Sequence, residues 1–379
     1  MPAASNMRID LAAQAAVRPH GAQNARAVPE APVAERPHEP TAAGAKPEGP
    51  VAERFRASPA AAAAGGERTG EAPRAAQAAG LSFGRAPASA PPAGEPAPSA
   101  PTGPLLGPAR LEAFFAVRGG RTVLAAKRHT APLKIAKAFD RPRELAVIVM
   151  DASPGMLAGD RYELTWTAER GARVYLTNQG HTRVHPAPPG RGAVLTQRYV
   201  LREDACIQAM MEPLMLYRDA ELDARTEVDL GPGAVWLSAE ILCPGRAGRG
   251  EKFAFRRYGA ELEVRHGGEP IFRSRQLIEP AIHRIAFPGA WEDCTHIGML
   301  YCFSDRLDTP HLEAAREAAE QAAAAVPGGC VAGASRAWRH GIVVMAAGDA
   351  AWKLQRTLGE AWRALRRTLL GLPGEVWRG

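Results

Sequence analysis

Beyond its N-terminal part, many segments of the chain alternate between one set of side chains and a more polar set at every second position. Thr226, Val228 and Leu230, for example, alternate with the acids Glu227 and Asp229. Because successive side chains of a strand point to opposite faces, this pattern predicts half-buried strands. Strands are predicted over residues 111–117, 121–128, 144–150, 161–168, 173–178, 194–201, 226–230, 234–242, 252–257, 260–266, 270–275, 296–303 and 341–346.

Turn signals separate these segments at short intervals. Gly267-Gly268 lies between two alternating runs and predicts a hairpin, since both central residues of such a turn can take a positive φ. The short spacing leaves no room for helical crossovers between parallel strands. The pattern therefore predicts a mainly β protein with stacked sheets.

Two helices are predicted late in the chain. Thr309-Pro310 supplies an N-cap and a proline in the first turn of a helix over 309–326. Between residues 351 and 370, leucines and a tryptophan recur every three or four positions beside a set of arginines. This spacing predicts an amphipathic helix that packs on the body or on a partner.

Residues 1–104 have a different composition. They hold 17 of the 33 prolines and only two aromatic residues, Phe55 and Phe83. A segment of this kind buries too little apolar surface to offset its chain entropy, so we expect it to be disordered. The predicted organisation is a low-complexity extension over 1–104 and one β-rich domain over 105–379.

Charge and cysteine content narrow the class of protein. The extension carries +1 of the formal net charge of +7, so it is not a basic arm for nucleic acid. The five cysteines are scattered without a CxxC pair, which favours reduced thiols and a cytoplasmic protein. No apolar run is long enough to span a membrane. No nucleophile elbow or HExxH motif is present, and the chain is not predicted to be an enzyme.

The stretch DASPGMLAGDRYELTW, residues 151–166, combines glycines, a proline and acids ahead of a strand. It does not fit a phosphate loop, because Asp160 follows Gly159 where a phosphate needs a donor. It does not fit a dinucleotide fingerprint either, because a strand follows in place of a helix. The local sequence predicts a bend around Met156 and Leu157.

This bend is also the first of five blocks that together resemble the urease accessory protein UreD/UreH family. ASPGMLAGD (152–160) resembles the family's SPGG-x-x-x-GD signature. The other blocks follow in the family's order: LTNQGHTRVHP (176–186), EPLMLYRDAEL (212–222), CPGRAGRGEKFAF (243–255) and WRALRRTLLG (362–371). The resemblance covers residues 105–379 and leaves the extension without a counterpart.

The chain departs from the family pattern at several positions. Met156 stands where a second glycine is usual, and Asn178 replaces a threonine. His181 and His185 stand where a small residue and an aromatic residue are commoner. The closing GLPGEVWRG lacks the usual Pro-Arg before its tryptophan.

The resemblance implies a fold and a function. The fold is a two-layer, helically wound β-sheet body with a helical end. The function is that of a metallochaperone scaffold for nickel insertion into apo-urease, in a complex with UreF and the GTPase UreG and dimeric through UreF. No tightly bound cofactor, membrane or nucleic acid is implied, and nickel is expected only in transit.

A nickel path needs weak oxygen ligands, and four residues of the motif blocks are candidates: Asp160, Glu251, Thr177 and Thr182. For Asp160 the alternative is a role in the bend. For Glu251 the alternative is an ion pair with Arg246 or Arg249, which the local sequence slightly favours.

Three other residues were considered as metal ligands. His181 and His185 lie about 13 Å apart if they are on one strand, so they cannot share one ion. Surface histidines are the simpler interpretation of both. Cys243 is a small core residue in the simpler interpretation.

A second class of function stays open. The arginines of the body, with Trp236, Tyr258 and Trp291 as stacking residues, could form a β-sandwich module that binds an acidic ligand or nucleic acid. The low aromatic content of 6% and the lack of a visible basic and aromatic face disfavour this alternative.

Overall fold

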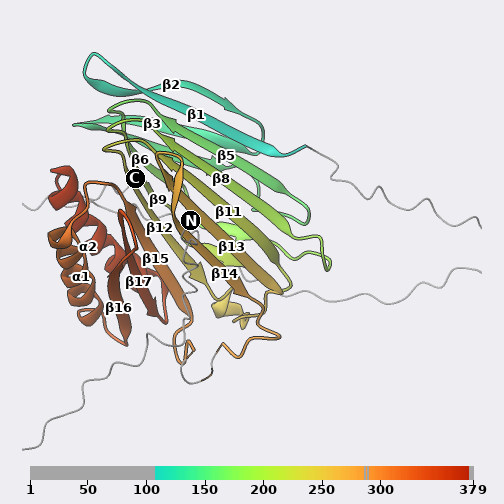
Figure 1. Ribbon diagram of the computed structural model, residues 1–379. Coiled ribbons are helices and arrows are strands. Elements are labelled where there is room, and N and C mark those ends of the chain that lie inside the picture. The colour runs from blue at the N-terminus through green and yellow to red at the C-terminus, as the bar shows by residue number, and fades with distance from the viewer. Residues whose placement is uncertain (1–106, 286, 288–289, 375–379) are drawn as a thin grey trace, which may run out of the picture. The chain divides into compact units, whose positions relative to one another are not determined.

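The computed structural model describes residues 107–285, 287 and 290–374. Within them the chain forms two β-sheets and two α-helices (Figure 1). The seven-stranded sheet has the order β14-β13-β11-β8-β5-β1-β2. Its strands are β1 (Ala109–Arg118), β2 (Arg121–His129), β5 (Arg161–Ala168), β8 (Ala193–Leu201), β11 (Glu221–Leu230), β13 (Arg257–His266) and β14 (Glu269–Ile278).

The ten-stranded sheet has the main order β16-β17-β15-β12-β9-β6-β4-β3, and β7 and β10 pair beside β12. Its strands are β3 (Leu133–Arg141), β4 (Glu144–Asp151), β6 (Arg173–Asn178), β7 (Thr182–Val184), β9 (Cys206–Met210), β10 (Leu214–Leu216), β12 (Val235–Cys243), β15 (His296–Phe303), β16 (Cys330–Arg336) and β17 (Gly341–Gly348).

The chain winds between the two sheets from β4 to β13. Apart from the short strands β7 and β10, each strand of one sheet is followed by a strand of the other, so β5, β8, β11 and β13 pair in parallel, as do β4, β6, β9 and β12. Parallel pairing arises here because the crossover passes through the opposite sheet and needs no helix. The mainly β, two-layer wound body predicted from the sequence is confirmed.

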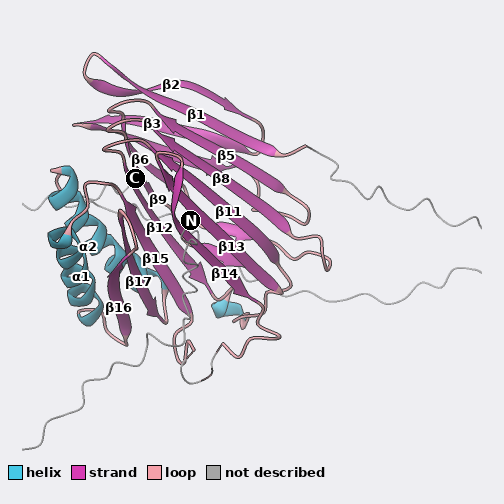
Figure 2. Ribbon diagram, viewed as in Figure 1, coloured by secondary structure: helices cyan, strands magenta, loops and turns pink. Residues whose placement is uncertain are grey.

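Two helices cover the outer face of the ten-stranded sheet (Figure 2). They are α1 (Thr309–Ala324) and α2 (Ala351–Leu370). Leu354, Leu358 and Leu365 of α2 are buried against Leu237 and Leu300 of the sheet. The amphipathic helix predicted over 351–370 therefore packs on the body. The core between the sheets is separate and contains Trp166 and Trp236, both fully buried.

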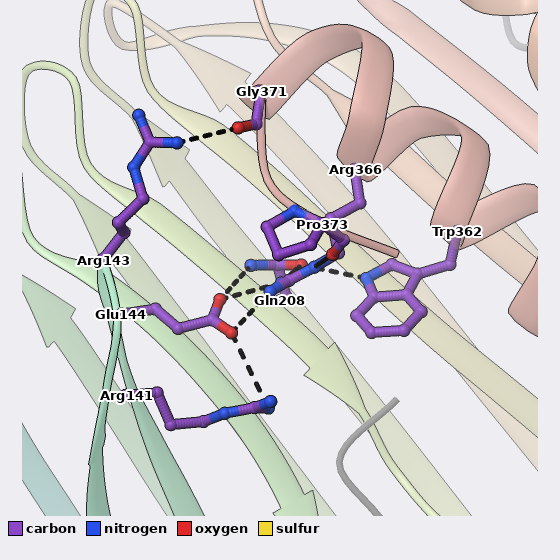
Figure 3. A network of polar contacts seen from close by, with 8 residues as sticks. All are labelled: Arg141, Arg143, Glu144, Gln208, Trp362, Arg366, Gly371 and Pro373. Atoms are coloured by element: carbon purple, nitrogen blue, oxygen red, sulfur yellow. Dashed lines mark hydrogen bonds and ion pairs between the residues drawn. The ribbon is translucent and has the colours of Figure 1, made fainter. Parts of the chain in front are cut away.

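A buried polar network fastens α2 to the sheet (Figure 3). Arg366 donates to both carboxylate oxygens of Glu144 on β4. Gln208 of β9 joins the pair, and its amide oxygen accepts hydrogen bonds from Arg366 and from the Trp362 indole. Arg366 also donates to the carbonyl of Pro373, 2.7 Å away, so the network holds the segment after the helix as well.

Some predicted elements need correction. Residues 252–256 are irregular, and the strand predicted over 252–257 does not form. The cap of α1 is Asp308 in place of Thr309, and the helix ends at Ala324. The hairpin at Gly267-Gly268 is confirmed, with φ of +58° and +86°. The predicted extension over 1–104 lies outside the described residues.

Candidate functional site

A cavity of about 480 Å³ lies between the two sheets. Five adjacent strands of the seven-stranded sheet contribute side chains to it, from β5 across β8, β11 and β13 to β14. At about 4.8 Å per strand, these five strands span about 19 Å. The cavity therefore crosses most of the width of the body. On its other side it is bounded by β4, β12 and β15 and by the segments around β7 and β10.

Glu240 is the acid in the middle of the wall formed by β12. It shares its side of the strand with Trp236, which lies in the inter-sheet core, so its carboxylate faces the cavity. In the strand register it stands opposite Met299 of β15, another lining residue. Among the residues that the structure describes, none donates a hydrogen bond to this carboxylate or forms an ion pair with it.

Glu240 is surrounded by protein and yet accessible to water. Burial raises the pKa of its carboxyl group to about 7. Its side chain is nevertheless exposed, because it borders the hollow between the sheets. The group is desolvated relative to bulk water, and its remaining hydration comes from the cavity. Near neutral pH the carboxyl group therefore changes between its neutral and charged forms.

The bend over residues 151–160 forms one end of the cavity. Asp151 accepts hydrogen bonds from the Ser153 hydroxyl at 2.6 Å and from the Tyr162 hydroxyl at 3.0 Å. Gly155, at φ +133°, lies so close to Arg183 that a Cβ would sit 2.6 Å from its carbonyl oxygen. Met156, buried beside it, bridges to Val184. The stretch is a bend, as predicted, and it also supplies cavity wall.

A second group of polar side chains lines the cavity near β7 and β10. Asn178 accepts a hydrogen bond from the Glu212 backbone N–H at 2.6 Å and donates to the Thr182 hydroxyl at 3.4 Å. His181 lies beside Glu212, with 4.0 Å between Nε2 and Oε2. All four residues line the cavity, and both side chains of the His181–Glu212 pair are 37% exposed. Because these lining residues are partly exposed, we call this group the outer opening of the cavity.

The charged residues of the lining are mostly acidic. Three of its acids, Asp151, Glu212 and Glu240, have no guanidinium partner among the described residues, and its only arginine among them is Arg183. Glu261 also borders the cavity, but its carboxylate lies on the outer face of β13 and pairs there with Arg275. Walls of low dielectric strengthen the field of charges that line a cleft. The cavity therefore favours cations over anions.

Asp160 does not line this cavity. Its carboxylate accepts a hydrogen bond from the Leu157 backbone N–H at 2.7 Å, and its own N–H donates to the Leu157 carbonyl at 3.1 Å. These two contacts close the bend. The cavity-lining acid of this motif is Asp151, nine positions earlier.

Glu251 is also outside the lining and forms the ion pair that the sequence favoured. Arg246 donates to both carboxylate oxygens, at 2.7 and 2.5 Å, and lies over the Tyr217 ring. The hydrogen bonds from Arg246 lower the pKa of the Glu251 carboxyl group. The pair fixes the loop between β12 and β13.

The two threonines face opposite sides of the ten-stranded sheet. Thr177 shares its side of β6 with Tyr175, which packs in the core under the helices, and it is absent from the cavity lining. Thr182 lines the outer opening. Of the four candidate residues, the structure places Thr182 alone at the cavity.

The remaining candidates have separate surroundings. His185 stacks edge-on against Tyr217 and contacts the Pro154 carbonyl at 3.1 Å, so it does not share a partner with His181. Cys243 is 1% exposed, in agreement with a core role. Trp236 and Tyr258 are buried, which makes their predicted role as exposed stacking residues wrong.

Sequence reasoning missed Glu240, although a signal was present. The strand sequence VWLSAEILC is apolar except at Ser238 and Glu240, and both face the cavity. A carboxylate in an otherwise buried strand is a candidate functional group because burying it is costly.

Two absences among the described residues set limits on the site. They contain no group of three or more His, Cys, Asp or Glu side chains arranged to hold a metal ion. They also contain no helix long and apolar enough to cross a membrane.

The described residues form a wound two-sheet β body with an acidic internal cavity and a docked C-terminal helix. A family model described as "UreD urease accessory protein" matches residues 107–378. The chain belongs to the UreD urease accessory protein family.

Individual relatives agree with this assignment. The chain is 32% identical over 190 residues to the urease accessory protein UreD of Acetivibrio thermocellus, covering 50% of this chain and 72% of the relative. It is 28% identical over 283 residues to UreD of Natronomonas pharaonis, covering 73% and 93%. With UreD of Trichodesmium erythraeum it is 33% identical over 157 residues, covering 40% of this chain and 56% of the relative.

Proposed function

We propose that this protein is a scaffold for nickel insertion into apo-urease, acting in the cytoplasm in a complex with UreF and UreG. In this proposal Ni²⁺ is cargo, and it crosses the body through the cavity between the two sheets. Membership of the UreD family supports the accessory role. The observation that carries the path is Glu240, a carboxylate that faces the cavity without a hydrogen-bond or ion-pair partner among the described residues.

The physical argument concerns the cost of moving a cation through protein. An isolated ion in a dry interior loses several kcal/mol of hydration free energy, so a path needs water and negative charge. The cavity supplies accessible volume, and Asp151, Glu212 and Glu240 supply carboxylates to its lining. Ligands must also release the ion. One carboxylate at a time, with water, binds more weakly than a closed site of three or four side chains.

The direct test replaces Glu240 by glutamine, which keeps the volume and removes the charge. In cells that express urease with its accessory proteins, we expect Glu240→Gln to lower nickel content and activity of urease several-fold. Copurification with UreF is expected to persist. Glu169→Gln is the matched control, because Glu169 is exposed at the end of β5 and does not line the cavity.

The outcomes separate the parts of the proposal. Normal nickel content with Glu240→Gln contradicts a path through this cavity. Loss of UreF binding or of soluble protein with this variant assigns Glu240 a structural role. A preparation of the wild-type chain that fails to support urease activation at all contradicts the accessory function itself.

The prediction that Asp160, Glu251 and Thr177 border the path stays a prediction. The contacts of Asp160 with Leu157, and of Glu251 with Arg246, provide each acid with a structural task. Nickel content per assembled complex distinguishes the two roles. A fall in nickel content at constant UreF binding with Asp160→Ala or Glu251→Ala supports a place on the path.

A further inference from the structure

The outer opening of the cavity has an arrangement that the path alone does not explain. The short strands β7 and β10 pair in parallel, with Leu214 opposite Thr182. This pairing brings the segment before β7 beside the segment before β10. Asn178 locks the two segments together through the Glu212 backbone N–H, at 2.6 Å. The side chains of His181 and Glu212 are therefore presented side by side from a fixed backbone.

The pair itself is poorly arranged as an ion pair and well arranged as a pair of ligands. Its atoms, His181 Nε2 and Glu212 Oε2, are 4.0 Å apart, too far for a hydrogen bond. Imidazole nitrogen and carboxylate oxygen bind divalent transition metals at about 2.0–2.2 Å. A single ion between the two atoms can therefore reach both with little movement of the side chains.

A third residue orients the carboxylate. Gln355 of α2 donates from Nε2 to Oε2 of Glu212 at 3.0 Å. Hydrogen bonds of this kind fix the direction of a metal-binding carboxylate and are typical of the surroundings of metal ligands. The exposure of both ligand side chains, 37% each, leaves room for water molecules to complete the coordination.

We propose that His181 and Glu212 form a two-ligand site for a divalent transition-metal cation such as Ni²⁺, completed by water, at the outer opening of the cavity. Imidazole makes the site select Ni²⁺ over Mg²⁺, which prefers oxygen ligands. With two protein ligands the site is weak, so the ion is exchanged readily. The further role of this site as the place where cargo enters or leaves the cavity rests on the proposed function.

The test of the site is direct binding of NiCl₂ to the full-length, tag-free protein, copurified with UreF where needed for solubility. His181→Ala and Glu212→Gln are each expected to weaken the binding at this site about 10-fold or more. Gln355→Ala is expected to weaken it about 10-fold through loss of orientation. His185→Ala is the control, because His185 contacts Tyr217 and Pro154 and does not line the cavity.

Additivity gives a second criterion. If both residues hold the same ion, the double variant His181→Ala/Glu212→Gln loses less than the sum of the two single losses, because either change already disables the shared site. Additive effects, or Ni²⁺ binding unchanged by both single variants, overturn the proposal. A tenfold excess of Mg²⁺ that displaces Ni²⁺ from the wild-type site also overturns it.

The same variants separate this site from the path through Glu240. Glu240→Gln leaves the outer site intact, so NiCl₂ binding at His181 is expected to persist while nickel loading of urease falls. Normal loading with Glu240→Gln contradicts the path and leaves the outer site standing. Loss of the His181-dependent binding in Glu240→Gln overturns the assignment of the outer site to His181 and Glu212.

Discussion

Arg366 of α2 and Glu144 of β4 form a two-pronged ion pair, with donor–acceptor distances of 2.8 and 2.6 Å, across a sequence separation of 222 residues. Their side chains are 3% and 1% exposed. A pair at this depth adds little net stability compared with apolar residues of the same shape, but breaking it leaves a charge buried without its partner. Separating α2 from the sheet therefore leaves a buried charge without its partner, so partial detachment of the C-terminal helix is costly.

Loss of one member of this pair is expected to be costly. Glu144→Gln keeps the side-chain volume but leaves the buried Arg366 charge without a counter-charge. We therefore expect the free energy of unfolding to fall by about 3–5 kcal/mol. Glu163→Gln is the control, because its ion pair with Arg110 is exposed and is worth about 1 kcal/mol or less. Denaturant unfolding of both variants checks this. Equal losses in the two variants contradict the prediction.

Glu240 is expected to make stability depend on pH. Its folded-state pKa of about 7 lies above the ordinary value of 4.5, so between these values the folded chain binds a proton that the unfolded chain has released. The stabilisation that comes from the protonated Glu240 carboxyl group is therefore fully present below about pH 4.5, and it is lost as the pH rises through about 7.

Glu240→Gln removes this dependence. Compared with the wild type, the variant is expected to gain about 1 kcal/mol at pH 8 and nothing at pH 5. A pKa shift of one unit corresponds to ~1.4 kcal/mol, so the full shift would give a larger gain. The expected gain is smaller because water in the cavity hydrates the carboxylate. Unfolding curves of both proteins at the two pH values measure the difference. A gain at pH 5 as large as that at pH 8 contradicts the assignment.

Two threonines provide a matched pair for the nickel path. Thr182→Leu places a larger apolar side chain at the outer opening, and we expect it to lower nickel loading of urease several-fold. Thr177→Leu makes the same change on the helix-facing side of the sheet; a path through the cavity predicts unchanged loading, whereas a fall in loading supports the earlier prediction that Thr177 borders the path. Nickel content of urease, normalised to UreF copurification, is the measurement. Equal effects of the two changes contradict a path at Thr182.

Deletion of residues 1–104 is expected to leave urease activation unchanged. This prediction comes from the composition of the segment, which is too poor in large apolar residues to form a core of its own. Urease activity and the thermal midpoint of the truncated and full-length chains are the measurements. Loss of activation by a truncated chain that is stably expressed assigns the segment a role in the complex.

Most long strands could be predicted because one face of each is buried and the other is not. Most strands that were missed lack this contrast; the exception is β16, whose alternation involves small residues of which none is fully buried. In β3 a bulge between Ile135 and Lys137 interrupts the period of two. In β9 four of the five residues are buried, so no alternation is present. The strands β7 and β10 have three residues each, too few to show a period.

The site was harder to predict than the fold. A motif identifies a loop but not the side of the sheet on which each side chain lies. Asp160 was predicted from its motif, whereas Asp151, which lines the cavity, lies just before that motif and was not a candidate. Thr177 and Thr182 belong to one motif and face opposite sides. Glu240 lies outside the motif blocks. It becomes a candidate only once Trp236, which lies on the same side of β12, is known to face the core between the sheets.

The winding of the chain has a consequence for synthesis on the ribosome. The residues that line the cavity extend along the sequence from Leu133 in β3 to Tyr301 in β15. Because the chain alternates between the two sheets, the two walls of the cavity are synthesised in turn. A nascent chain that stops before β14 and β15 has Glu240 but lacks Gln276 from the opposing wall and Met299 from the neighbouring strand of the same wall. The cavity is thus enclosed only when translation has passed most of the domain, and a chain that ends prematurely lacks part of its walls.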